Sequence, residues 1–123
     1  MDSNVIIDYT ASLLPQEGSD FVEDLLNNDF LISVAVKIEV LGFDDVPHKL
    51  VVMEEFVNSA VVLPLDEAVT KQTISLRRKY KKLKLGDAII AATALVHGLT
   101  IISRNTKDFQ NIQGLNCVNP HES

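Results

Sequence analysis

Three carboxylates from distant parts of the chain are the side chains best placed to do chemistry. Asp2 precedes a short apolar run, Glu39 lies inside an apolar segment, and Asp87 opens an alanine-rich segment. Taken singly, each has an ordinary structural explanation. Asp2 would be an exposed terminal residue, and Glu39 would pair with Lys37 or face solvent on a helix. Asp87 would be a helix N-terminal carboxylate that stabilises the helix by about 1 kcal/mol. Clustered carboxylates would raise one another's pKa unless a cation compensates them. Oxygen ligands suit Mg²⁺ or Mn²⁺, which can activate water for a phosphoryl displacement.

Short apolar segments are expected to form the strands that bring these residues together. We expect strands within residues 5–8, 30–36, 60–65, 99–103 and 115–120. They alternate with helical segments, which predicts a parallel sheet with helices on both faces, an α/β sandwich. Ligands in such sheets sit at the carboxyl ends of strands. A further polar group follows the fourth strand, and it consists of Ser103, Arg104, Asn105 and Asp108.

The helical segments carry recognisable start and stop signals. Ser19 or Asp20 can cap a helix over 21–29, and Pro47 can begin one that runs to about residue 59. Asp66 is expected to cap a helix that extends to about Tyr80. The segment 86–98 is the clearest helix, with Gly98 as the residue that ends it. The segment 104–109 is expected to form a turn.

The composition fits one globular domain covering residues 1–123. Hydrophobic residues make up 46% of the chain and charged residues 23%. No apolar stretch approaches the roughly 20 residues that a membrane-spanning helix needs. A secretory signal pattern is absent, and the single cysteine cannot form an internal disulfide. These features predict a cytoplasmic protein without a membrane partner.

The net charge of −6 argues against bulk electrostatic binding of nucleic acid, but the charge is uneven. Six of the eleven basic residues fall within residues 77–84. This basic run can be a solvated helix end, which we favour from the run alone, or a local patch that meets phosphates.

The fingerprints GxxxxGK[ST], GxGxxG and GxSxG are absent, and no histidine pair has metal-ligand spacing. A nucleotide-binding or phosphatase-like α/β protein is a further alternative.

Three stretches together resemble the PIN domain family, especially the VapC-type toxins of bacterial toxin–antitoxin pairs. They are MDSNVIIDY (1–9), KIEVLGF (37–43) and KLGDAIIAATALVHGLTIISRNTKDF (84–109). The resemblance implies a three-layer α/β/α sandwich with a central parallel sheet and a ribonuclease that uses Mg²⁺ or Mn²⁺. It also implies an RNA substrate, a homodimer and a cognate antitoxin that neutralises the enzyme. A PIN-fold module that binds RNA or protein without cutting is the main alternative.

The resemblance assigns roles to individual residues. Asp2 and Asp87 are expected to bind the metal directly, with Glu39 as third ligand or as the holder of a metal-bound water. Asn105 falls on the fourth acidic position of the family, and Asp108 follows it closely, so either would complete the site through water.

Four further expectations complete this assignment. Asn4 would orient Asp2, Ser103 and Arg104 would touch the scissile phosphate, and the basic run would steer RNA. The family usually has several apolar residues before its first aspartate, forming a central strand. Met1 alone precedes Asp2 here, so we expect either a start upstream or a shortened strand.

Overall fold

The first helix occupies a segment that we expected to be a strand. The computed structural model describes residues 1–28, 30–42 and 46–121, and in it Ser3–Thr10 forms helix α1. Asp2 is its N-cap, and its side chain accepts a hydrogen bond from the Ser3 N–H. The strand predicted at 5–8 is therefore wrong. Three consecutive apolar residues cannot by themselves distinguish a strand from a buried helix segment, and here the capping aspartate favours the helix.

Within the described residues, short strands form two parallel pairs. Strand β1 (Leu31–Ser33) pairs with β2 (Val61–Leu63), and β3 (Ile101–Ile102) pairs with β4 (Cys117–Val118). The strand expected over 30–36 ends early, because Ser33 caps helix α3 (Val34–Leu41) and its hydroxyl accepts the Val36 N–H at 3.2 Å. The other expected strands are confirmed in shorter form.

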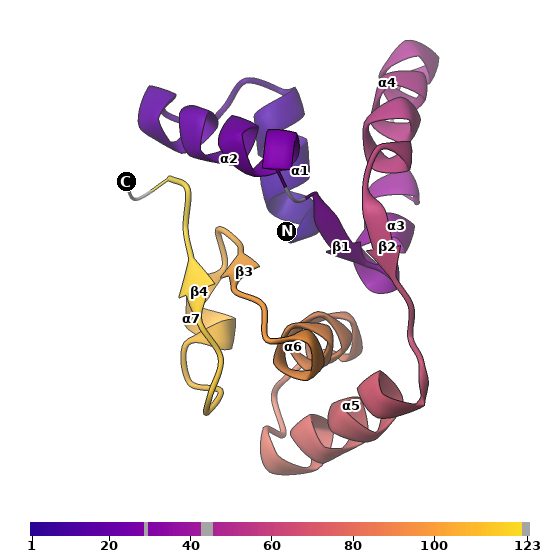
Figure 1. Ribbon diagram of the computed structural model, residues 1–123, viewed down its shortest axis with the longest axis vertical. Helices are drawn as coiled ribbons and strands as arrows, with labels where there is room; N and C mark the ends of the chain where they lie inside the picture. Colours follow the sequence, from indigo (N-terminus) through magenta and orange to yellow (C-terminus); the bar gives the residue numbers. More distant parts are fainter. Residues whose placement is uncertain (29, 43–45, 122–123) are drawn as a thin grey trace.

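The start of the chain lies between these two strand pairs. The α-amino group of Met1 donates to the Leu31 carbonyl of β1 at 3.3 Å. One residue later, the Asp2 N–H donates to the Ile102 carbonyl of β3 at 2.8 Å. Met1 and Asp2 therefore bridge the two pairs and place the Asp2 side chain at their shared carboxyl edge. The predicted central parallel arrangement is present, and a two-residue segment joins its halves (Figure 1).

The remaining helices largely follow their sequence signals. Helices α4 (Pro47–Asn58), α5 (Glu67–Lys79) and α6 (Leu85–His97) confirm the three predicted there. Asp66 caps α5 by accepting the Val69 N–H at 2.9 Å, and Gly98 ends α6 with φ +66°. Helix α2 (Gln16–Asn28) begins before the expected cap, and residue 29 of the predicted segment lies outside the described residues. A short helix α7 (Thr106–Phe109) replaces the expected turn.

Helix α6 joins the two halves of the fold. It contacts both strand pairs, through β1 and β3, and it also packs on α3 and α5. Its buried alanines (Ala88, Ala91, Ala92, Ala94) let the helix lie close to these elements. Figure 1 shows the strands between α1 and α2 on one side and α5 and α6 on the other, which confirms the three-layer α/β/α arrangement. Among the described residues, no helix is long and apolar enough to cross a membrane.

Candidate active site

Asp2 is a buried carboxylate whose two oxygens both accept hydrogen bonds. Its side chain is held at the junction of β3 and α1 and the residue is only 4% exposed. The Ser3 N–H donates to Oδ1 at 2.7 Å, and the Ser103 hydroxyl donates to Oδ2 at 2.8 Å. The Asn4 amide lies 3.4 Å from Oδ2 and 3.2 Å from the Ser103 hydroxyl, to which it donates. These bonds fix the rotamer of Asp2, which is the contact expected of Asn4.

Glu39 reaches the same place from helix α3. Its Oε2 accepts a hydrogen bond from the Ser3 hydroxyl at 2.7 Å, and that hydroxyl also lies 3.4 Å from Asp2 Oδ1. Ser3 thus links the two carboxylates, a role that the sequence analysis missed. Its only signal in the sequence is its place between Asp2, a predicted ligand, and Asn4.

Asp87 comes from the first turn of α6, and its electrostatic environment shows which acids are near it. The pKa of Asp87 is raised to about 6, mainly by burial and then by the charges of Asp2, Asp108 and Glu39, in that order. The positive charge of Lys84 lowers the pKa of Asp87. Because like charges make ionisation costly, the upward shift places Asp2, Glu39 and Asp108 within electrostatic range of Asp87, and we call these four carboxylates the acidic cluster.

Gly86 allows α3 and α6 to approach within this cluster. A Cβ added at Gly86 would lie 2.8 Å from Glu39 Oε1, which is closer than van der Waals contact permits. The glycine therefore gives the Glu39 carboxylate its place against the start of α6, next to Asp87.

The segment after β3 supplies the remaining predicted residues. Ser103 is completely buried, and its hydroxyl accepts the Asn105 N–H at 2.9 Å while donating to Asp2. The Asn105 side-chain amide donates to Asp108 Oδ2 across the first turn of α7. Asn105 and Asp108 are therefore paired with each other at the edge of the cluster.

Arg104 is held through both its backbone and its side chain. Its N–H donates to the side-chain oxygen of Asn4 at 3.0 Å, and its guanidinium lies 3.3 Å from Asp8 Oδ2. The His121 ring lies 2.8 Å from the same Asp8 oxygen. Asp8 is buried and was also missed by the sequence analysis, although a carboxylate inside an apolar run was a signal. These contacts support the segment that carries Ser103.

The donor set fits a hard divalent cation. All four clustered acids offer carboxylate oxygens, which Mg²⁺ and Mn²⁺ prefer. Burial lowers the pKa of the Met1 α-amino group to about 6, so the amine beside Asp2 carries less than a full charge at neutral pH. A bound cation would offset the repulsion that raises the pKa of Asp87. In the described part of the chain, no three His, Cys, Asp or Glu side chains are already gathered as a metal-holding group.

Known proteins resemble this chain over almost its whole length. The sequence profile of the PIN domain matches residues 1–115. Ribonuclease VapC1 of Rickettsia felis is 26% identical, and the match covers 96% of this chain and 92% of that protein.

Solved structures also resemble this chain over almost its whole length. A toxin–antitoxin complex from Klebsiella pneumoniae contains a chain that is 30% identical, with a TM-score of 0.79 and coverage of 99% and 97% of the two chains. VapBC2 of Rickettsia felis, bound to a DNA fragment from its promoter, has a TM-score of 0.79 at 19% identity. That match covers 96% of this chain and 95% of the other, and it shows the fold alone.

Proposed function

This chain belongs to the PIN domain family, and from its acidic cluster we propose that it is an endoribonuclease that depends on Mg²⁺ or Mn²⁺. The observation that carries this proposal is the raised pKa of Asp87, which burial causes first and to which the charges of Asp2, Asp108 and Glu39 add. A set of carboxylates with this electrostatic environment is typical of a cation-dependent phosphodiester hydrolase. The likeness to Ribonuclease VapC1 supports RNA as the substrate.

We assign the roles of the residues as follows. Asp2 and Asp87 would bind the cation directly, and Glu39 would be the third ligand or hold a coordinated water. Asn105 or Asp108 would complete the site through water. Ser3, Asn4 and Ser103 keep Asp2 and Glu39 in place through the hydrogen bonds described above.

A bound divalent cation at such a site supplies water activation and charge stabilisation at the phosphodiester, which permits hydrolysis without a covalent enzyme intermediate. The contribution of the chain is to hold Asp2 buried and hydrogen-bonded to Ser103, with Asp87 half-buried and Glu39 exposed to the solvent from which a substrate would approach. Ser103 and Arg104 were expected to touch the scissile phosphate, but Ser103 is completely buried with its hydroxyl on Asp2, and the Arg104 N–H donates to Asn4. In the free protein the Arg104 guanidinium is paired with Asp8.

We further propose that the protein is the toxin of a type II toxin–antitoxin pair and acts in the cytoplasm as a homodimer. The Klebsiella relative comes from a toxin–antitoxin complex, which supports an antitoxin as partner. An arginine of that antitoxin reaching the acidic cluster would form charge-assisted hydrogen bonds and compete with the cation.

The proposal is tested by incubating the protein with a pool of RNA under three conditions. They are wild type with Mn²⁺, wild type with EDTA, and the variant Asp87→Asn with Mn²⁺. We expect cleavage in the first condition and a loss of at least about 100-fold in the other two, since a missing ligand or ion removes the electrostatic stabilisation of the transition state. Equal cleavage in all three would refute a metal-dependent nuclease.

A PIN-fold module that binds RNA or protein without cutting is the second candidate. One observation favours it: Asp2 accepts hydrogen bonds from both Ser3 and Ser103, and Glu39 also accepts one from Ser3. These bonds compete with metal coordination for the same oxygens. RNA binding without cleavage at any Mn²⁺ concentration would support this candidate over the enzyme.

A further inference from the structure

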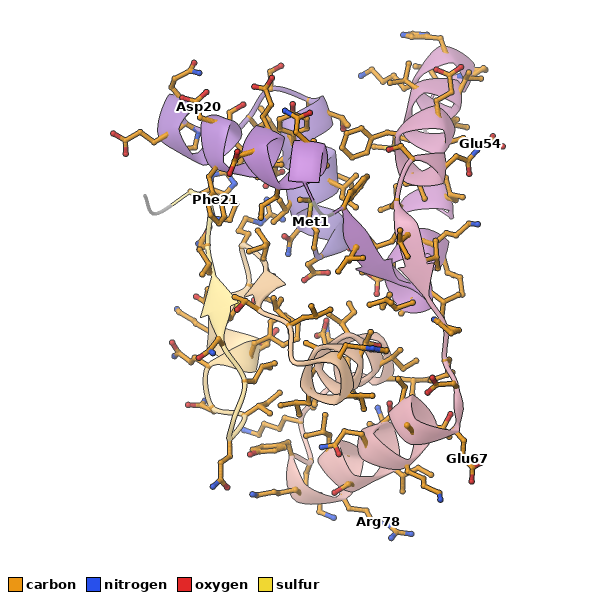
Figure 2. The ribbon with its side chains drawn as sticks, viewed as in Figure 1. Met1, Asp20, Phe21, Glu54, Glu67 and Arg78 are labelled. Atoms are coloured by element: carbon orange, nitrogen blue, oxygen red, sulfur yellow. The ribbon has the colours of Figure 1, made fainter. Side chains whose placement is uncertain are left out.

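In the folded protein, residues of the basic run (77–84) contribute to two separate surfaces, each with one further lysine from outside the run. Lys71, Arg78 and Lys79 line a shallow hollow of about 590 Å³ on the outer face of α5, which we call the outer hollow. Figure 2 shows Arg78 at the edge of the molecule, directed away from the strands. Arg77 has a structural contact, since its guanidinium donates to the Leu83 carbonyl at 3.2 Å.

The second surface is a pocket beside the acidic cluster, which we call the lysine pocket. It has a volume of about 360 Å³ and lies between the segment that joins α5 to α6 and the residues in and after α7. Its lining includes Lys81, Lys82, Lys84, Asp87, Lys107 and Asp108. The volume is within the range of small-ligand sites.

Hydrogen bonds connect the two walls of the lysine pocket. The Gln113 N–H donates to the Tyr80 hydroxyl at 3.1 Å, and Tyr80 itself lines the pocket. The Lys79 ammonium donates to the Gln113 side-chain oxygen at 3.3 Å. The segment before α6 and the segment after α7 are therefore held at a fixed separation.

The charge of the lysine pocket is opposite to that of the whole protein. Its four lysines are exposed and outnumber its two carboxylates, Asp87 and Asp108, whereas the chain carries a net charge of −6. Electrostatic attraction of a phosphate depends on charges within a Debye length, about 8 Å at physiological ionic strength. The pocket is thus a local anion site that shares Asp87 with the acidic cluster.

We infer that the lysine pocket binds the RNA strand next to the bond that is cut, by receiving the backbone phosphate of the neighbouring nucleotide. This inference rests on the proposed function and assigns a substrate subsite to it. An acidic cluster repels a phosphodiester, so a polyanion needs positive charge close by to remain there. Lysine ammonium groups bind phosphate as point charges and need no fixed orientation. The outer hollow is basic too, but none of the clustered acids lines it.

The experiment compares two double variants that each remove two positive charges. Lys81→Gln with Lys107→Gln changes both walls of the lysine pocket, and Lys71→Gln with Arg78→Gln changes the outer hollow as the matched control. Binding of a fluorescent single-stranded oligoribonucleotide is followed by anisotropy in EDTA at salt concentrations from about 50 to 200 mM. EDTA prevents metal-dependent cleavage, so the signal reports binding alone.

The pocket variant should weaken RNA binding at least about 10-fold at the lowest salt concentration. Its plot of log affinity against log salt should be shallower by about 0.7, the change expected for one lost phosphate contact on a single strand. The control variant should bind within about 2-fold of wild type. Equal losses in the two variants, or an unchanged slope for the pocket variant, would overturn the inference.

Two further measurements separate this inference from the proposed function. In a competition assay, free inorganic phosphate should displace the labelled oligoribonucleotide much less well than unlabelled RNA does. Equal displacement would mean a site for free phosphate and would overturn the inference.

Cleavage in Mn²⁺ is then measured separately. Selective loss of binding in the pocket variant without cleavage by wild type would support the subsite while contradicting the nuclease. Cleavage with an unchanged KM in the pocket variant would contradict the subsite alone.

Discussion

Replacing Asp87 by asparagine should stabilise the metal-free protein. Asp87 has its pKa raised from 3.8 to about 6, mainly by burial and then by the nearby charges of Asp2, Asp108 and Glu39. Between these two pH values the folded state binds more protons than the unfolded state, so the free energy of unfolding falls as pH rises. Asparagine resembles the protonated acid and removes this penalty.

The expected size follows from the pKa. A change from 3.8 to about 6 corresponds to a ceiling of about 3 kcal/mol above pH 6, where both states are ionised. Asp87 is only partly buried, so solvent screening reduces the gain to roughly 1 kcal/mol. For a chain of this length, that raises Tm by about 4 °C. The gain should shrink toward zero as pH falls from about 6 to below 3.8.

Thermal unfolding in EDTA at pH 7.5 and at pH 3.5 measures this effect, with Asp20→Asn as the control. Asp20 is an exposed carboxylate on α2 (Figure 2), so its variant should leave Tm nearly unchanged. Adding Mn²⁺ should stabilise wild type by mass action and the Asp87→Asn variant much less, which reverses their order. A lower Tm for the variant in EDTA, or a gain that persists at pH 3.5, would refute the reasoning.

Two further substitutions test the supports of the cluster. Gly86→Ala would bring a Cβ within 2.8 Å of Glu39 Oε1 and displace that flexible carboxylate, while alanine favours the helix by up to about 1 kcal/mol. Calorimetry should find weaker Mn²⁺ binding with an equal or higher Tm, and unchanged affinity would contradict this. Asp8→Asn should cost roughly 1–3 kcal/mol in urea unfolding, because charge-assisted bonds to Arg104 and His121 are lost. A loss below about 0.5 kcal/mol would show that these pairs contribute little.

Local signals in the sequence were sufficient for three of the helices. Pro47, Asp66 and Gly98 mark helix ends through interactions within a few residues, which is why α4, α5 and α6 were predicted closely. The expected roles of Asp2 and Asp87 came from the resemblance and stay predictions. Their proximity, however, has physical support in the raised pKa of Asp87.

The short segments around the site were less predictable. The apolar run at residues 5–8 and the second half of the run at residues 30–36 became helices, because Asp2 and Ser33 act as N-caps. Apolar runs this short have the same hydrophobicity in a buried strand and in a buried helix. Capping by Asp2 and Ser33 then decides between them, and a capping residue type beside so short an apolar run is also compatible with the end of a strand.

Only the tertiary structure decided what surrounds each acid. Ser103 reaches Asp2 across 101 residues of sequence, and His121 reaches Asp8 across 113. The basic run reads as one patch along the chain, yet the end of α5 turns its residues toward two different surfaces. The sequence alone determined the acidic and basic residue types and helices α4, α5 and α6, but not helices α1, α3 and α7 around the site. Long-range packing determined which of these side chains share a site, because contacts between distant segments have no local pattern that specifies them.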